Sequence, residues 1–598
     1  MVPFTLVDKF SGYRAKEDVT NLKPGYLVVG SQNVLTNEGE RVAVRRGFTL
    51  DGQANASLFP IVSSYDWTRH LGDERHLRSW DDNLQYRYVD SLGVVTWRNL
   101  ADSFSSVNFN WSEFWDTTEQ IDRLLFVNGT SNIFDWSGGL ATFASATATT
   151  ITKQGVETWG EEGFYTAGTR QVVIDGVTYT YLGGEATTTI TGVTPDPTLG
   201  GHAVGAVIHQ AIRTTPNSSM TGIPATFHND LIAPLLNYIY VGSLIDRQVY
   251  ISRQNSFTDY TFGTPRLVGQ GALLTLDATP VAFMPQEDNM YISAGKDQWY
   301  QSILQLSAEQ VNEALIVKRL KTTAQQGAQS QALVSKIKNS VVYISFEPTL
   351  DELGRVENVE TPQATNISDP IKIDFDGYDF TGGALAYWRF FILLSVPQNG
   401  VVRLYNLAEG WWEAPQTFPV GRFAIIDGEL YGHSPSTPET YKLLDGVNDN
   451  GAPIDAVAAF SYNQYGKRAN LKSFDEHYVE GYISSNTELQ LTINYDINGC
   501  TASNSYMING ADNSIICPFG GGASLGKQSF GKFSLAGRAS TEITDPPPKF
   551  RVIKTFPRTD FYEYQPVFSS DGEDQRWELL SFGPNTALST SDNVPIKQ

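Results

Sequence analysis

The chain has 598 residues, more than one hydrophobic core organises, so we expect several domains. Its 65 acidic and 43 basic residues give a net charge of −22. A surface this acidic argues against sequence-specific DNA reading and against binding to anionic membranes.

The chain carries few signs of export. Cys500 and Cys517 are the two cysteines, too few for a disulfide framework, and their spacing does not show whether they pair. Residues 1–10 contain no signal peptide, and no apolar run has the length of a membrane span. We therefore expect a soluble protein, assembled in a cytoplasm, without a membrane-spanning segment.

The N-terminal region predicts a hairpin that is followed by a pair of arginines. Leu35–Val44 reads as two short strands, and Arg45, Arg46, Gly47 and Phe48 close the hairpin. Such a pair is either a solvated strand end or an interface to an acidic neighbour.

Residues 58–143 predict further hairpins and one basic loop. Leu84–Val89 and Val94–Trp97 form a hairpin pattern. The loop before them could line a DNA path or contact a partner subunit, and a plain exposed loop is the alternative. Its basic residues are Arg69, His70, Arg75, His76 and Arg78.

Residues 144–222 change in character and predict a small inserted β-module. The segment is rich in threonine, and short strands flank the turn at Asp175-Gly176. An insertion at a surface turn costs little closure entropy, so we expect an outward-facing knob.

The hairpin pattern resumes over residues 223–451. It is clearest in Asn399–Ser434, where strands turn at Asp427-Gly428 and where Trp411 and Trp412 follow a turn. Ser307–Leu320 is the exception, because its spacing and capping pattern predict a helix.

Residues 452–598 carry longer alternating strands, which predict a β-sandwich-like domain with a glycine-rich tip at Asn509–Gly531. Short hairpin units cannot bury a face alone, and a radial arrangement around an axis solves this. The predicted fold is therefore all-β. A β-propeller-like core is formed by residues 1–143 and 223–451, 144–222 is the inserted β-module, and 452–598 is the C-terminal β-sandwich-like domain.

No stretch predicts catalysis, a cofactor or a metal. Two glycine-rich near-matches to a phosphate-binding loop, around Lys527 and Lys532, lack the Ser or Thr that would hold magnesium. Gly432–Ser436 lacks the last glycine of a nucleophile elbow, and Asp445–Gly451 lacks a ligand that a calcium loop needs. We expect a protein that is not an enzyme and has no cofactor.

A series of short motifs, none specific by itself, occurs along the chain in a defined order. They are Gly25–Phe48, Phe126–Gly139, Val241–Tyr260, Val401–Pro415, Asp427–Ser434 and Tyr465–Ile483. In this order the sequence resembles the propeller-containing tail proteins of tailed bacteriophages, the nozzle, tail tubular protein B and tail-hub group. The resemblance covers most of residues 20–485.

The resemblance implies a structural virion protein. Such proteins form a homohexameric ring below the portal and adaptor, continue the DNA channel, retain the genome until infection and mount tail fibres or spikes. It suggests Arg45, Arg46 and Phe48 as contacts near the upper ring, and Trp411 and Trp412 as core residues. Further interface candidates are Arg75 and Arg78, and the candidate gate or distal tip is Gly520, Gly521, Gly522 and Lys527.

The acidic composition fits such a channel, because negative walls let viral DNA slide through the lumen without sequence-specific binding. Two other functions stay open. One is a glycan-binding or glycan-hydrolysing β-propeller, and the other is a receptor-binding tail adhesin. A short-tailed nozzle and the hub of a longer tail are not distinguished by the sequence.

Overall fold

The computed structural model describes residues 6–15, 22–37, 41–55, 57–70, 72–261, 271–275, 280–286, 289–294, 298–304, 315–320, 334–338, 341–344, 365–367, 369–381, 383–463, 471–497, 500–513, 549–584 and 589–591. Nearly all regular structure in them is β-strand. The predicted all-β class, with a propeller and a sandwich, is confirmed.

The propeller consists of antiparallel sheets that we number as blades one to seven within the described residues. Blade one is β6 (Ser63–Thr68), β7 (Glu74–Trp80), β8 (Asn83–Val89) and β9 (Val95–Ala101); blade two is β10 (Asn110–Asp116), β11 (Ile121–Val127), β12 (Asn132–Trp136) and β19 (Arg213–Pro216); blade three is β20 (Leu231–Leu235), β21 (Tyr238–Gly242), β22 (Gln248–Ile251) and β23 (Ala272–Thr275). Blade four is β24 (Pro280–Gln286), β25 (Asn289–Ala294), β26 (Gln298–Leu304) and β27 (Leu315–Leu320); blade five is β28 (Val334–Lys338), β29 (Val341–Ile344) and β30 (Thr365–Asn366). Blade six is β31 (Leu385–Trp388), β32 (Phe391–Val396), β33 (Val401–Asn406) and β34 (Trp411–Trp412); blade seven is β35 (Arg422–Ile426), β36 (Glu429–His433), β37 (Thr440–Leu443) and β5 (Phe48–Leu50).

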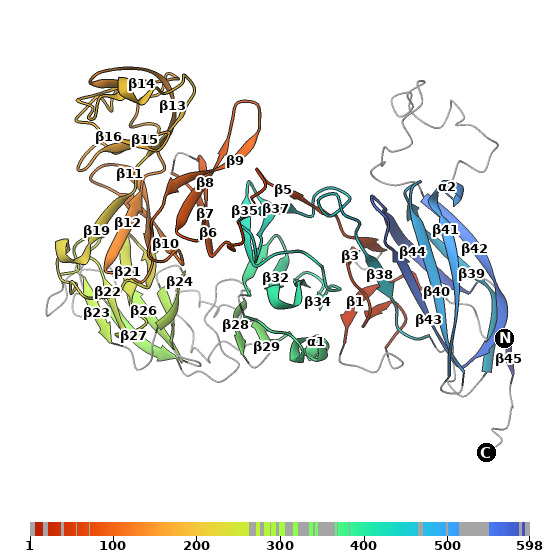
Figure 1. Ribbon diagram of the computed structural model, residues 1–598. Helices are drawn as coiled ribbons and strands as arrows, with labels where there is room; N and C mark the ends of the chain where they lie inside the picture. The colour runs from red at the N-terminus through yellow and green to blue at the C-terminus, as the bar shows by residue number, and fades with distance from the viewer. Residues whose placement is uncertain are drawn as a thin grey trace, which may run out of the picture.

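The first strands of the blades contact one another in a radial order. β31 contacts β35, β35 contacts β6, β6 contacts β10, β10 contacts β20 and β20 contacts β24. Figure 1 shows the blades following one another in chain order along a curve, with blade seven beside blade one. The N-terminal strand β5 completes blade seven, with Leu50 opposite Tyr441 and Phe48 opposite Leu443. Blade seven therefore combines strands from distant parts of the sequence, and it contacts blade one through β35 and β6.

The hairpins form where the sequence predicts tight turns. Asp427 and Gly428 have φ of 52° and 75°, and Asp175 and Gly176 have φ of 49° and 80°. These positive values at both central residues are those of the primed turns that match strand twist. The Asp-Gly pairs thus fix the register of two hairpins from local sequence alone.

A separate small sheet interrupts blade two between β12 and β19. Its strands are β13 (Leu140–Thr147), β14 (Thr150–Lys153), β15 (Gln171–Ile174), β16 (Val177–Thr180), β17 (Thr189–Thr191) and β18 (Val207–Gln210), with the 3-10 turn η1 (Pro197–Gly200) before β18; a second 3-10 turn, η2 (Asn217–Ser219), follows β19. Ile151, Trp159 and Phe164 belong to its own buried core. The sheet stands as a knob on blade two, away from the sandwich (Figure 1). Its strands begin and end slightly before the bounds 144 and 222 that the sequence suggested.

The sandwich lies at the end of the molecule opposite blades three and four (Figure 1). Its first sheet contains β3 (Val34–Asn37), β4 (Arg41–Val44), β44 (Trp577–Pro584), β39 (Leu471–Ile483) and β42 (Lys549–Phe561), with β45 (Ser589–Ser591) beside β39. The second contains β38 (Ala456–Ala459), β43 (Glu563–Ser570), β40 (Glu488–Ile497) and β41 (Cys500–Asn509). Nearby are the parallel pair β1 (Ser11–Arg14) and β2 (Tyr26–Val28), and the short elements η4 (Asp369–Ile371), α1 (Lys372–Asp376) and α2 (Gly510–Asn513). The 3-10 turn η5 (Pro397–Asn399) connects β32 and β33 of blade six.

Two expectations differ from the structure. The sequence predicts residues 1–143 in the propeller, yet Val42 of β4 pairs with Leu579 of β44, so the first hairpin belongs to the sandwich sheet. The local sequence pattern predicts the hairpin but does not show which sheet the hairpin joins. Within the predicted helix Ser307–Leu320, residues 315–320 form β27 and pair with β26, while 307–314 lie outside the described residues. Backbone pairing with the open edge of β26 makes residues 315–320 a strand, although their apolar residues have helical spacing.

Blade six and the sandwich share one hydrophobic core. Trp412 and Phe375 pack in the same cluster as Val34, Leu491 and Leu579. Trp412 is fully buried, and its indole N–H donates to the carbonyl of Ile367 at 2.6 Å. The prediction that Trp412 is a core residue is confirmed, whereas Trp411 is only partly buried.

Replacing Trp412 with alanine should lower the free energy of unfolding by about 3–5 kcal/mol, because a large cavity opens in this shared core. Urea unfolding followed by circular dichroism measures the change. Leu92→Ala is the control, because Leu92 is 86% exposed and its loss should change stability by less than about 0.5 kcal/mol. Equal urea midpoints for Trp412→Ala and Leu92→Ala would contradict the role of Trp412 in the shared core.

Candidate functional site

The chain passes from the sandwich to the propeller through a buried arginine. Arg45 lies between β4 and β5, and its side chain has no exposed surface. Its Nη1 and Nη2 donate to the two carboxylate oxygens of Asp449, each at 2.6 Å. Its Nε donates to Asn33 Oδ1 at 3.0 Å, and its guanidinium carbon lies 4.1 Å from the centre of the Phe418 ring. We call Asn33, Arg45, Thr417, Phe418 and Asp449 the junction latch.

The junction latch joins segments that are far apart in the sequence. Asn33 Nδ2 donates to Thr417 Oγ1 at 2.9 Å and to the carbonyl of Asp455 at 2.7 Å. Gly47 follows Arg45, and a Cβ there would collide with the backbone of Asn448. The latch therefore fixes the start of β5, the link after blade seven and the start of the sandwich relative to one another.

The three predicted upper-ring residues have different surroundings. Arg45 is held in the junction latch and its side chain has no exposed surface, so the interpretation as a solvated strand end is wrong, and its guanidinium bonds to residues of its own chain. Phe48 is buried against Tyr441, with ring centres 5.1 Å apart. Arg46 alone of the three is exposed. Sequence patterns mark the arginine pair but do not show which member turns inward.

A buried glutamate forms a second connection between the domains. Glu413, after β34, accepts the backbone N–H of Thr36 at 2.8 Å and its hydroxyl at 2.7 Å, and it accepts the indole N–H of Trp411 at 3.1 Å. Glu413 is fully buried, and this burial raises its pKa from an ordinary 4.5 to about 7. Thr36 belongs to β3, so Glu413 ties the sandwich edge to blade six.

The predicted basic loop consists of the turn after β6 and the first residues of β7, and its arginines contact residues outside blade one. Arg78 donates to Gln85 Oε1 at 3.0 Å and to Thr440 Oγ1 of blade seven at 2.8 Å. Burial lowers its pKa to about 9, which leaves the guanidinium charged at neutral pH. Arg75 donates to the carbonyl of Gly138 at 2.8 Å and pairs with Asp73 at 2.7 Å. These contacts hold blades together.

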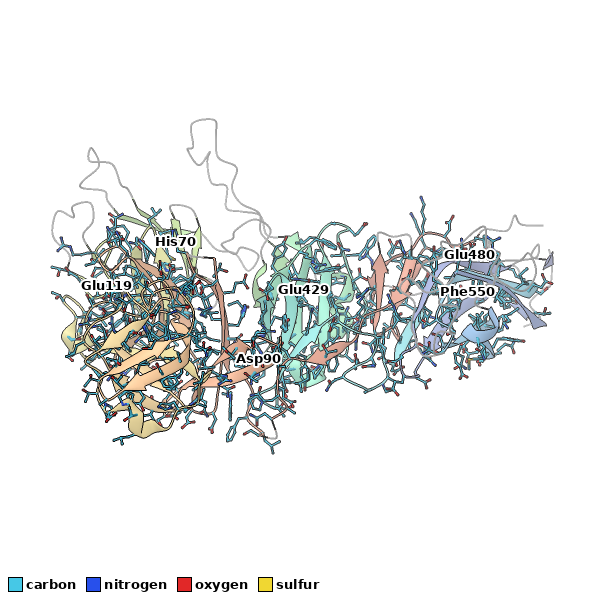
Figure 2. The ribbon with its side chains drawn as sticks, turned by 90° about the horizontal axis from the view of Figure 1, so that it is seen from above. His70, Asp90, Glu119, Glu429, Glu480 and Phe550 are labelled. Carbon is cyan, nitrogen blue, oxygen red and sulfur yellow. The ribbon has the colours of Figure 1, made fainter. Side chains whose placement is uncertain are left out.

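A groove of about 920 Å³ lies where the sandwich hairpin meets blade six. We call it the junction groove. Leu35, Phe390 and Leu444 supply apolar surface, and charged residues around them carry both signs, including Arg46, Arg389, Glu409, Glu429, Arg576 and Glu578. Figure 2 shows Glu429 in the middle of the molecule, between the propeller end marked by Glu119 and the sandwich marked by Phe550.

The predicted gate or tip, Gly520, Gly521, Gly522 and Lys527, lies outside the described residues. Across the part of the chain that the structure describes, there is no helix long and apolar enough to cross a membrane.

Replacing Arg45 with alanine should cost about 3–5 kcal/mol of stability, because Asp449 is left without its partner in a buried setting. The matched control is Arg389→Ala. Arg389 also pairs with a carboxylate, Glu429 at 3.5 Å, and also lies over an aromatic ring, that of Trp388, but its side chain is 55% exposed. An exposed pair contributes about 0–1 kcal/mol. Thermal unfolding of both variants distinguishes a buried latch from a surface contact.

Glu413 should make stability depend on pH. The unfolded chain ionises this carboxyl near pH 4.5, but the folded chain keeps its proton until about pH 7. Its contribution to stability is present below pH 4.5 and is lost as pH rises to 7, by up to about 3 kcal/mol. Denaturation midpoints of wild type and Glu413→Gln, measured from pH 4.5 to 7.5, should diverge in that direction. If the midpoints of the two proteins changed with pH in parallel, the pKa of Glu413 would be that of an ordinary carboxyl.

No protein-family model matches the sequence, and no curated protein matches it. Solved structures with remote similarity include BBS1N in complex with ARL6DN (13% identity, TM-score 0.24, covering 68% of this chain and 99% of that one). Others are Saccharomyces cerevisiae Sqt1 (10%, 0.27, 67% and 99%) and Kluyveromyces lactis Hsv2 (11%, 0.22, 59% and 97%). TM-scores this low carry no argument about the function of this chain.

Proposed function

We propose that this protein is a structural component of a bacteriophage tail, a nozzle or hub ring that extends the DNA channel below the portal and adaptor. In this role it retains the genome until infection and gives tail fibres or spikes a mounting surface. The order of the segments that resemble the tail proteins, from Gly25–Phe48 to Tyr465–Ile483, supports this assignment.

The observation that carries the proposal is the sharing of one N-terminal segment by both domains. Residues 34–37 and 41–44 form an edge of the sandwich sheet, Arg45 is held in the junction latch, and residues 48–50 complete blade seven. A hinge between propeller and sandwich would need this segment to release both sheets. Such a connection suits the wall of a tube that resists the pressure of packaged DNA.

Ring formation needs side-to-side contacts in which different faces of identical subunits meet and close on rotation. The junction groove suits such a contact, because an apolar floor surrounded by charges of both signs provides an anchor and a specific rim. Phe390 is 48% exposed there and is the proposed anchor. We propose a homohexamer.

The inserted knob offers a separate surface for fibres or spikes. Val156, Leu182, Leu199 and Val204 are each at least 71% exposed. All four belong to this one module, and we propose them as part of its contact surface. Because the knob has its own core, it can carry a partner without disturbing blade two.

The placement of the arginines and the net negative charge support passage of DNA through the ring without sequence-specific binding. Arg75 and Arg78 are engaged within the chain, so they are not arranged to replace the counterions of DNA phosphates. The net charge of −22 keeps the surface repulsive to a polyanion.

Negative-stain electron microscopy of the source particles, labelled with antibody against this chain, tests the proposal. Label on the tail axis below the capsid, with sixfold averages, is the expected result. Label on peripheral spikes would favour the receptor-binding adhesin. Absence from particles, together with release of reducing ends from host polysaccharide, would favour the glycan-hydrolysing propeller.

Replacing Phe390 with aspartate should remove an anchor worth about 2 kcal/mol or more at each subunit contact, and tails should fail to assemble. Leu92→Asp is the control, because Leu92 is equally apolar and more exposed but lies on blade one away from the groove. Particle assembly is scored after complementation with each variant. Normal tails with Phe390→Asp would place the subunit contact elsewhere.

A further inference from the structure

A pocket of about 450 Å³ lies where blade seven meets blade one, with a contribution from blade six. Asp66 of β6, Glu74 and His76 of β7 and Asp427 of the β35–β36 turn line it. Glu74 and Asp427 are 353 positions apart in the sequence. No sequence motif brings these residues together, which is why the sequence predicted no metal site.

Asp66 orients the imidazole of His76. His76 Nδ1 lies 3.0 Å from Asp66 Oδ1, and the other oxygen of Asp66 accepts the backbone N–H of Ile425 at 2.7 Å. When Nδ1 carries the proton and donates it to Asp66, Nε2 presents a lone pair on the opposite side of the ring. A carboxylate behind a histidine is the usual outer support of a metal-binding imidazole.

In that tautomer the lone pair of Nε2 faces Glu74. The Nε2 to Glu74 Oε2 distance is 3.4 Å, longer than the usual hydrogen-bond range. Two ligands of a tetrahedral Zn²⁺, each about 2.0–2.1 Å from the ion, are separated by roughly the same distance. Ligand atoms of Glu74, His76 and Asp427 all lie within 4.8 Å of one another.

Charge also favours a cation here. Three carboxylates surround one imidazole, and His76 is buried while the carboxylates of Glu74 and Asp427 reach solvent. Without a cation these carboxylates repel one another across the seam between two blades. An ion can enter from solvent and keep a water ligand.

We propose that Glu74, His76 and Asp427 bind a divalent transition metal, of which Zn²⁺ fits the nitrogen and oxygen ligands best, with Asp66 as the positioning residue. The ion links β7 of blade one to the β35–β36 turn of blade seven. It thereby clamps the propeller at the seam between the first blade and the last. This site does not depend on the proposed tail function.

Isothermal titration of the full chain, stripped with EDTA and then titrated with ZnCl₂, tests the proposal. We expect one tight equivalent per chain and a higher midpoint of thermal unfolding. Asp427→Asn, in an exposed turn, and His76→Gln should abolish that equivalent, and Asp66→Asn should weaken it about 10–100-fold. His70→Gln is the control, since His70 is exposed on the turn between the same two strands.

Co²⁺ titration of the same samples provides a second readout, because tetrahedral coordination gives an intense visible absorption that hydrated Co²⁺ lacks. That absorption should be absent in Asp427→Asn and present in His70→Gln. The absence of a tight equivalent in the stripped wild-type chain would overturn the proposal. Zn²⁺ binding that is unchanged in Asp427→Asn would also overturn it.

Discussion

The arrangement of the domains depends on the buried ion pair between Arg45 and Asp449. A guanidinium without exposed surface is costly unless its donors find acceptors. Asp449 accepts from both Nη atoms at 2.6 Å, Asn33 accepts from Nε at 3.0 Å, and the carbonyl of Arg46 accepts from Nη1 at 3.0 Å. Because Arg45 lies between β4 and β5, the same contact fixes the edge of the sandwich and the closing strand of the propeller. The two domains depend on the same segment, because neither the sandwich sheet nor blade seven is complete without it.

A common principle links the latch, Glu413 and the arginines of blade one. Each is an ionisable side chain placed at a seam, where a partner from another blade or domain satisfies it. Arg78 reaches Thr440 of blade seven, and Glu413 reaches Thr36 of the sandwich. Burial at these seams perturbs the pKa of Glu413 and Arg78, so a perturbed pKa here marks structural junctions. The proposed cation site lies at a similar seam, where a metal ion would connect ionisable side chains of blades seven and one.

Much of the local structure could be predicted from the residues. The Asp-Gly turns at 175 and 427 adopt the positive φ that their sequence favours, and Trp412 is buried as its place in a hairpin suggested. Local pattern was insufficient at residues 315–320, where an open strand edge makes a strand of a segment with helical spacing. It was also insufficient for Arg45, because burial of a charge depends on whether a distant carboxylate is in reach.

The sequence by itself determined the all-β class, the hairpin turns and the division into propeller, insert and sandwich, because these follow from side-chain alternation and turn chemistry over a few residues. Only the tertiary structure decided which sheet receives the N-terminal hairpin, which arginine turns inward, and how Glu74 and Asp427 come to share a pocket. Those outcomes depend on contacts between residues hundreds of positions apart. No local propensity encodes such contacts, since they exist only after the blades have closed on one another.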